Sequence, residues 1–268
     1  MNFELLFDPL FRTPFLVGLI MAAVLPLLGN LLRLRDEWLA ALGLAYLAGA
    51  SGLVGLAVGI PAVLGAPLGA LAGAVVKAFG RFRGNTVYAM MVVIGWAATM
   101  LVAANSSLGS LVGHALVEGQ LYFAGPIHLG AAAIVGTLSA LALPVLMPAL
   151  VRSRLLPGHE VSNRQAAWRW HLGFDLLAAA GIAAATATLG LMGTFALVLV
   201  PAWCAFRVAP GWRRALLLAA VIGAGAYLAA FAVALRLDQP FGPVLVAVLL
   251  LIAAILALPP LRSAAEKP

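Results

Sequence analysis

Long apolar runs separated by short polar breaks fill almost the whole chain. We identify nine such runs, each close to the roughly 20 residues that an α-helix needs to cross the hydrocarbon core of a bilayer. They cover residues 14–32, 38–59, 61–77, 87–104, 129–151, 171–188, 191–206, 215–235 and 243–260. The apolar positions are continuous rather than alternating, which argues against a transmembrane β-barrel. The pattern predicts an all-α integral membrane protein, a polytopic bundle of about nine (8–9) transmembrane helices in a single domain, 1–268.

The count of eight or nine depends on the break at Ile60-Pro61, which separates the second and third runs. This break fits either a full second crossing or a re-entrant turn. Both runs beside it carry glycines at three- and four-residue spacing, from Gly49 to Gly73. Small residues at that spacing let helix backbones approach closely. We expect this pair of helices to pack tightly, and a pair that moves against its neighbours during transport is the alternative reading.

The basic residues fix an orientation for these runs. Of the sixteen Lys and Arg residues, all but Arg12 and Arg236 fall into five clusters, each following an odd-numbered run. The clusters are Arg33/Arg35, Lys77/Arg81/Arg83, Arg152/Arg154/Arg164/Arg169, Arg207/Arg213/Arg214 and Arg262/Lys267. Cytoplasmic loops of membrane proteins are enriched in Lys and Arg. The clusters therefore predict an N-terminus outside and a C-terminus in the cytoplasm, with the lipid membrane as the surrounding medium.

Composition supports this class and excludes others. The chain is 64% hydrophobic and 9% charged, whereas soluble domains carry about 25% charged residues. Its net charge of +7 sits at the ends of apolar runs and forms no continuous polar face, so we expect no nucleic acid as a partner. The single cysteine, Cys204, excludes an intrachain disulfide. Residues 1–12 show no cleavable signal peptide, and the first run should stay in the bilayer.

Motifs for catalysis are missing from the sequence. There is no phosphate-binding loop, no serine nucleophile motif and no zinc-protease motif. We therefore expect no enzymatic activity and no bound cofactor, and any ATP hydrolysis should come from a separate subunit. A divalent metal remains possible as transported substrate.

A few polar residues near the bilayer could bind a cation or a partner. His114 and Glu118 are four residues apart, a spacing that could place both on one helix face as metal ligands. The alternative is a His–Glu contact in a solvated loop. Asp175 has no obvious partner in the sequence, and we expect the N-terminus of its helix to stabilise it. His128 should cap a helix or lie at the membrane interface, and Asp238 should form an external turn that could also shape a docking surface.

The last third of the chain carries a recognisable order of motifs. Gly193-Thr-Phe-Ala-Leu-Val-Leu-Val-Pro201-Ala202 is followed by Arg213-Arg214 and then by Asp238-Gln-Pro240-Phe-Gly242-Pro243. This stretch resembles the permease subunits of ATP-binding-cassette (ABC) importers for zinc, manganese and iron. Weaker matches, such as Leu28-Gly29-Asn30, extend the resemblance over nearly the whole chain.

The resemblance implies a multi-pass permease of the bacterial cytoplasmic (inner) membrane. Two copies would form a homodimer around the pathway, with a cassette ATPase subunit below and an external solute-binding protein above. The loop at about 152–171 takes the place of the segment that contacts the ATPase. Arg164, Arg169 and Ala167 are the candidate contacts, and ordinary topology-setting charge is the alternative for the two arginines.

One departure from the family pattern concerns the cargo. Members of this family carry an Asp and a His in the second span, at positions that are Ala40 and Leu44 here. No Asp, Glu, His, Lys or Arg occurs anywhere in 38–76. Either the cation uses other ligands, such as His114 and Glu118, or the cargo is a metal chelate or another small solute. A stand-alone secondary transporter is the remaining alternative, and it would need paired charges in the membrane.

Overall fold

Nine long helices make up most of the part of the molecule that the structure describes. The computed structural model describes residues 9–80, 84–105, 119–156, 158–163, 166 and 168–257, and these residues contain no strand. The long helices are α2 (Pro9–Leu34), α3 (Ala40–Ala57), α4 (Ala62–Phe79), α5 (Asn85–Asn105), α7 (Pro126–Leu155), α9 (Trp168–Leu189), α10 (Leu191–Val208), α11 (Trp212–Leu237) and α12 (Phe241–Ala257). Two short elements, η1 (Leu121–Phe123) and α8 (His159–Ser162), complete the described part. Each predicted run coincides with one long helix, so the predicted fold class is confirmed.

Eight of these helices are long and apolar enough to cross a membrane, and the ninth, α12, has 17 residues. Helices α3 and α4 have 18 residues each. At 1.5 Å per residue each is about 27 Å long, close to the thickness of the hydrocarbon core. The break at Ile60-Pro61 therefore joins two helices of full crossing length.

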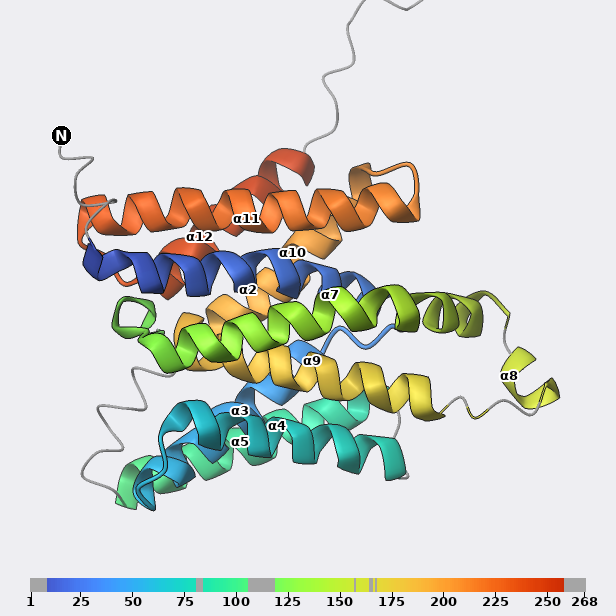
Figure 1. Cartoon of the computed structure of the whole chain (residues 1–268), viewed down its shortest axis with the longest axis horizontal. Helices are drawn as coiled ribbons and strands as arrows, with labels where there is room; N and C mark the ends of the chain where they lie inside the picture. The colour runs from blue at the N-terminus through green and yellow to red at the C-terminus, as the bar shows by residue number, and fades with distance from the viewer. Residues whose placement is uncertain are drawn as a thin grey trace, which may run out of the picture.

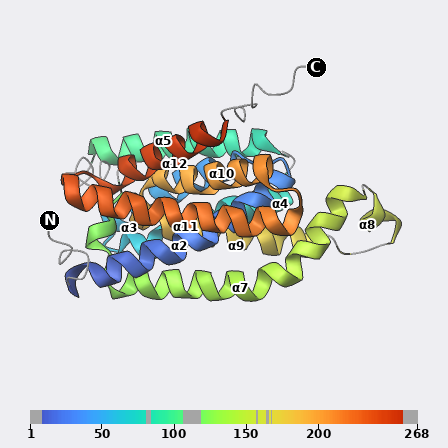
Figure 2. The ribbon, with the colours of Figure 1, turned by 90° about the horizontal axis from the view of Figure 1, so that it is seen from above.

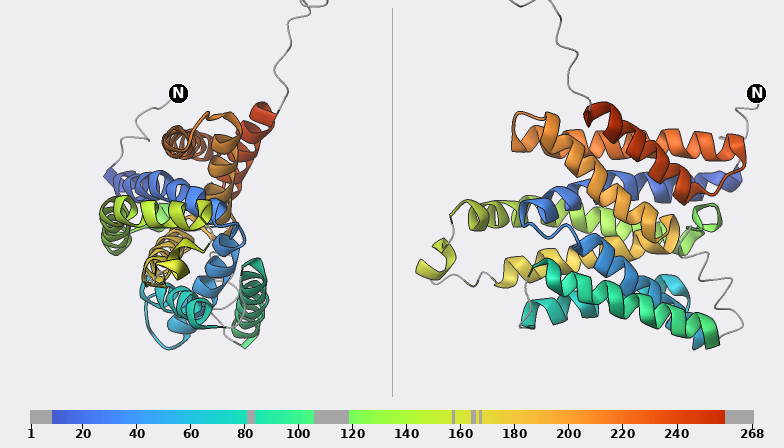
Figure 3. Two further views of the ribbon diagram at one scale, coloured as in Figure 1. Left: turned by 90° about the vertical axis from the view of Figure 1, so that its right-hand side faces the viewer. Right: turned by 180° about the vertical axis from the view of Figure 1, so that it is seen from behind.

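The long helices lie roughly along one common axis, which is horizontal in Figure 1. Helices α2, α3, α9 and α10 lie inside the bundle, and α5, α7 and α12 lie at its margins (Figure 3). In the most apolar stretch of α2 and of α9, 67% of the residues are buried, against 22% for α5 and for α7. The marginal helices therefore present their apolar side chains outward, to lipid or to another chain.

Because consecutive long helices alternate in direction, the loops sort onto two ends of the bundle (Figures 1 and 2). We call one the basic end, where α2, α4, α7 and α10 finish with Arg33, Lys77, Arg154 and Arg207 in or near their last turns. The opposite end holds the turns at Ile60, Gly190 and Asp238. Among the described residues, only Arg12 and Arg236 are basic residues of the opposite end.

Glycines allow the central helices to touch backbone to backbone. A side chain at Gly29 of α2 would collide with the carbonyl oxygen of Val198 in α10. A side chain at Gly69 of α4 would lie 2.5 Å from the Leu47 carbonyl oxygen of α3. Ser51 of α3 adds a polar tie, since its hydroxyl oxygen accepts a hydrogen bond of 3.2 Å from the backbone N–H of Gly69. The predicted tight packing of α3 on α4 is thus confirmed.

Candidate functional site

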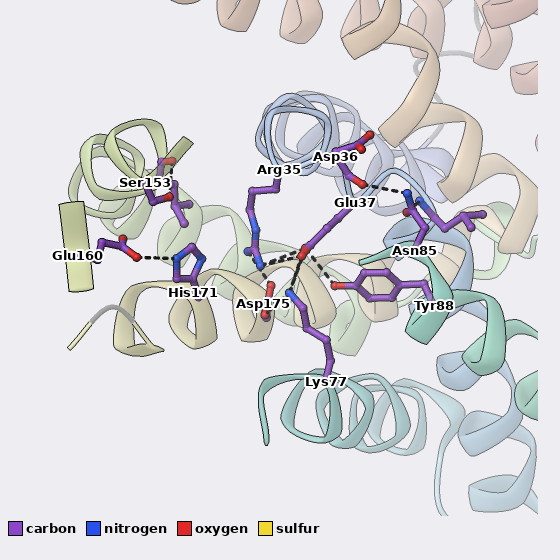
Figure 4. A network of polar contacts seen from close by, with 12 residues as sticks. Arg35, Asp36, Glu37, Lys77, Asn85, Tyr88, Ser153, Glu160, His171 and Asp175 are labelled. Carbon is purple, nitrogen blue, oxygen red and sulfur yellow. Dashed lines mark hydrogen bonds and ion pairs between the residues drawn. The ribbon is translucent and has the colours of Figure 1, made fainter. Parts of the chain in front are cut away.

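A tight turn at the end of α2 starts the principal polar site of the described chain. Asp36 adopts a left-handed conformation with φ of 59°. Its N–H donates to the Arg33 carbonyl at 3.0 Å, and the N–H of Glu37 reaches back to the Leu32 carbonyl at 2.9 Å. This pair of bonds is the Schellman motif that closes helix C-termini, here with Asp in the position that glycine usually takes. The turn directs Arg35 and Glu37 to the same side, toward α4 and α9 (Figure 4).

Four charged side chains meet at that place, and we call them the charge network: Arg35, Glu37, Lys77 and Asp175. Arg35 Nη1 lies 2.7 Å from Asp175 Oδ1, and Lys77 Nζ lies 2.7 Å from Asp175 Oδ2. Glu37 completes the set, with one carboxylate oxygen 3.0 Å from Arg35 Nη2 and the other 3.0 Å from Lys77 Nζ. Each carboxylate therefore contacts both cations, and the network joins the α2–α3 turn, α4 and α9 (Figure 4).

The network is buried and electrically balanced. The side chains of Asp175, Arg35, Glu37 and Lys77 are 4, 8, 10 and 10% exposed. Two positive and two negative charges leave no net charge at the site. Removing one partner from a buried pair is costly, typically about 3–5 kcal/mol, because an uncompensated charge stays behind. The three segments that carry these groups, the α2–α3 turn, α4 and α9, are therefore held in one arrangement as long as water does not enter the site.

Arg35 shows the balance between burial and attraction. Burial of its guanidinium lowers the pKa, but the nearby Asp175 and Glu37 carboxylates outweigh it, so the pKa is raised above its usual value. The guanidinium also lies over the ring of Phe174, 5.2 Å from the ring centroid. Arg35 thus stays charged, and its contacts with α9 come from two consecutive residues.

Two residues of α5 extend the network to a fourth helix. The Tyr88 hydroxyl donates to Glu37 Oε2 at 3.3 Å, in a buried position. Asn85 binds the backbone on both sides of Glu37. Its Nδ2 donates to the Asp36 carbonyl at 2.9 Å, and its Oδ1 accepts from the Leu39 N–H at 3.1 Å. The start of α5 is therefore fixed to the same turn.

On its other side the network lies next to the connection between α7 and α9. His171, one helical turn before Asp175 on α9, has its Nε2 3.6 Å from Glu160 Oε2 of α8. The imidazole is within electrostatic range of Arg35 as well (Figure 4). Both residues belong to the predicted partner-binding loop 152–171, and the structure brings them into contact with each other.

Within the predicted loop 152–171, α8 lies beyond the ends of the long helices at the basic end (Figures 1 and 2). A hollow of about 440 Å³ lies between α7, α8 and α9, and its polar lining includes Arg152, Glu160 and Arg169. Arg169 is exposed and stacks on Trp168, 5.8 Å from the ring centroid. The other two predicted contacts, Arg164 and Ala167, lie outside the described residues.

The interpretation of Asp175 as a residue without a partner is wrong. We expected the helix N-terminus to stabilise it, but two cations from helices far apart in sequence do so. Arg35 and Lys77 were interpreted only as topology-setting charges, and they are buried partners of this carboxylate. One signal could have revealed the network: Asp175 and Glu37 are acidic residues among the basic clusters, and buried charges are almost always paired.

The positions considered for metal binding give a mixed outcome. Ala40 and Leu44, which replace the family's ligand pair, are buried at 0 and 2% exposure inside the bundle. His114 and Glu118 lie outside the described residues, so their role as ligands stays a prediction. In the described part of the chain no three His, Cys, Asp or Glu side chains group together as metal ligands.

The motif positions of the last third are partly brought together. A side chain at Gly193 of α10 would lie 3.8 Å from Cα of Gly242 in α12, so the two motif glycines lie at one helix contact. Pro201 and Ala202 are buried within α10. Asp238 ends α11 in a left-handed conformation with φ of 50°, which confirms the predicted turn, and the exposed Pro240 precedes α12. His128 also caps as expected, since its Nδ1 accepts from the Gly125 N–H at 3.2 Å.

Aromatic side chains hold the opposite end, and we call them the aromatic cluster: Phe11, Phe15, Tyr122, Tyr227, Phe231 and Phe241. Phe231 contacts four of the other rings, with centroids 5.4 to 6.3 Å away. The cluster joins α2, η1, α11 and α12. Burial, with a smaller effect of Asp238, raises the pKa of Tyr122 to about 12, so its phenol stays neutral.

Comparison with known proteins gives a clear result for the fold. No protein-family model matches the chain, and no curated protein is detectably similar to it in sequence. A solved structure of PsaBC from Streptococcus pneumoniae in complex with Fab matches with a TM-score of 0.81 and 14% identity, covering 95% of this chain and 93% of that chain. A metal-chelate type ABC transporter in an inward-facing conformation matches with a TM-score of 0.74 and 15% identity, covering 96% and 90%. The chain has the fold of these two solved chains over almost its whole length.

Proposed function

We propose that this chain is the membrane-spanning permease subunit of an ATP-driven importer. The observation that carries the proposal is the match of nearly the whole chain to two solved chains, one of them from a metal-chelate type ABC transporter. The order of motifs from Gly193 to Gly242 supports it from the sequence, since the resemblance to ABC metal permeases rests on those residues. ATP hydrolysis would come from a separate subunit.

The basic end is the cytoplasmic side in this proposal, and the chain lies in a bacterial inner membrane. Basic residues gather on the cytoplasmic side of membrane proteins, and the projecting α8 offers a surface for a cassette ATPase there. Arg169 is exposed at the base of this projection. The opposite end would receive an external solute-binding protein. A second copy of the chain would complete the pathway, because marginal helices such as α5 and α7 expose wide apolar faces.

The cargo we propose is a divalent metal ion, zinc, manganese or iron, delivered by the solute-binding protein. A metal chelate or another small solute is the second candidate. One observation favours it: Ala40 and Leu44 stand where the family's Asp and His stand, and both are buried apolar residues. A stand-alone secondary transporter is less well supported, because the membrane-embedded charges that the structure pairs lie together at the basic end, away from the middle of the bundle.

Copurification and uptake test the proposal. The tagged chain should copurify with a cassette ATPase. In proteoliposomes, uptake of labelled zinc or manganese, or of a chelate, should require enclosed ATP and the external binding protein. Full uptake by this chain alone would contradict the proposal. The double change Arg164→Glu and Arg169→Glu should weaken the complex, with Arg12→Glu at the opposite end as the control.

A further inference from the structure

The charge network and the Glu160–His171 contact lie one helical turn apart on α9, and through this helix they connect α8 with the α2–α3 turn, α4 and α5 (Figure 4). We infer that these two groups together are the mechanical relay of the transporter, which makes Asp175 a positioning residue that couples α8 to α4 and α5. The inference rests on the proposed function, in which α8 meets the ATPase. It adds specific residues through which movement of α8 reaches the rest of the bundle.

The first step of the argument is the position of α9. His171 and Asp175 are four residues apart, so they lie on one face of the helix, one turn from each other. His171 faces Glu160 of α8, and Asp175 faces Lys77 and Arg35. A displacement of α8 that moves the start of α9 therefore moves both contacts together.

The second step is the energetic cost of separating the charges of the network. Asp175 is 4% exposed and its two oxygens each bind a different cation at 2.7 Å. If α9 moved without α4, Lys77 and Asp175 would separate while still excluded from water, which is costly for a buried pair. The low-energy movement keeps the four charges together, so α4 and the α2–α3 turn follow α9.

The third step is the attachment of α5. Among the long helices that the structure describes, α5 packs mainly on α3. At the basic end its start is tied to the same turn by Asn85 and by Tyr88, whose hydroxyl binds Glu37. Helices α4 and α5 thus move with α9 as one body.

The relay can be tested in the assembled complex of permease and ATPase. Spin labels on Ser162→Cys of α8 and Thr86→Cys of α5, both exposed positions, would be placed in a Cys204→Ser background. The distance between the labels would be measured without nucleotide and after trapping with ATP and vanadate. With an intact network we expect the distance to stay unchanged on trapping. With Asp175→Asn, or with the milder Glu160→Gln, we expect it to change, because α8 then moves without α5.

Controls separate this relay from a general structural role. Asp36→Asn lies beside Glu37 but is exposed, and its left-handed conformation accepts Asn, so it should behave as wild type. ATP hydrolysis should persist in the Asp175→Asn complex while transport per ATP falls about tenfold, within the range typical of coupling between sites. A native complex that transports, combined with an unchanged label distance in both variants, would overturn the relay alone. A native permease that neither binds the ATPase nor transports would overturn the importer proposal itself.

Discussion

The two ends of the bundle are held together by different physics. At the basic end, four buried charges join segments through contacts of 2.7 to 3.0 Å. At the opposite end, six aromatic rings join helices through edge and tilted contacts with centroids 5.4 to 6.5 Å apart. Ion pairs depend strongly on distance and partner, whereas ring contacts tolerate several orientations. In the relay inferred above, the basic end transmits movement, whereas the ring contacts of the aromatic cluster tolerate small changes in helix orientation.

Among the substitutions that test this difference between the two ends, the removal of one charge from the network should cause the largest loss of stability. We expect Lys77→Met to destabilise the protein by roughly 3–5 kcal/mol, because Glu37 and Asp175 then share one cation in a buried site. Unfolding in detergent micelles, followed by tryptophan fluorescence, measures the change. The matched control is Arg33→Met, since Arg33 is an exposed cation of the same end. An equal effect of the two substitutions would show that burial and pairing of Lys77 contribute nothing.

A somewhat smaller effect is expected at the aromatic cluster. Phe231→Ala removes a ring that is 0% exposed and should cost about 3 kcal/mol through lost packing. Phe231→Leu keeps most of the volume and should cost only about 1 kcal/mol. The same unfolding measurement applies. If the leucine variant lost as much stability as the alanine variant, ring-specific contacts would matter here and the tolerance that we assign to this end would be wrong.

Two buried tyrosines, one at each end of the bundle, allow the two ends to be compared by the same substitution, the removal of one hydroxyl. Tyr88 donates to the charged Glu37, and Tyr227 donates to the Phe15 carbonyl at 3.0 Å. Hydrogen bonds to charged groups are the stronger class. Tyr88→Phe should therefore destabilise by about 2 kcal/mol and Tyr227→Phe by about 1 kcal/mol. A larger loss of stability for Tyr227→Phe than for Tyr88→Phe would contradict the claim that the hydrogen bond to the charge network is the stronger of the two.

The smallest effect concerns the two turns that share one backbone conformation. Asp36 and Asp238 are the non-glycine residues of the described chain with positive φ, one at each end. Glycine adopts that conformation without strain, so Asp36→Gly and Asp238→Gly should each change stability by less than about 1 kcal/mol. A large loss for Asp36→Gly alone would mean that its carboxylate belongs to the charge network.

The sequence predicts the helices of this molecule well and its polar site poorly. Apolar runs locate each crossing because a membrane helix must satisfy its own backbone hydrogen bonds, so length and hydropathy carry the signal. Glycine spacing likewise predicts the contact of α3 with α4. The sequence does not predict the charge network because Lys77 and Arg35 lie 98 and 140 positions from Asp175, and only the packing of α2, α4 and α9 brings them together. The enrichment of Lys and Arg in cytoplasmic loops already explained why Arg35 and Lys77 lie at helix ends. The sequence therefore offered no reason to expect that they pair with carboxylates.

The most direct test of the account is the number of substrate molecules transported per ATP hydrolysed in proteoliposomes that contain permease, ATPase and binding protein. Asp175→Asn would be compared with Tyr227→Phe, one conservative change at each end. The account predicts that Asp175→Asn lowers this ratio about tenfold while ATP hydrolysis continues, and that Tyr227→Phe leaves it near the wild-type value. Equal ratios for the two variants would contradict the claim that the charge network couples the ATPase to the bundle.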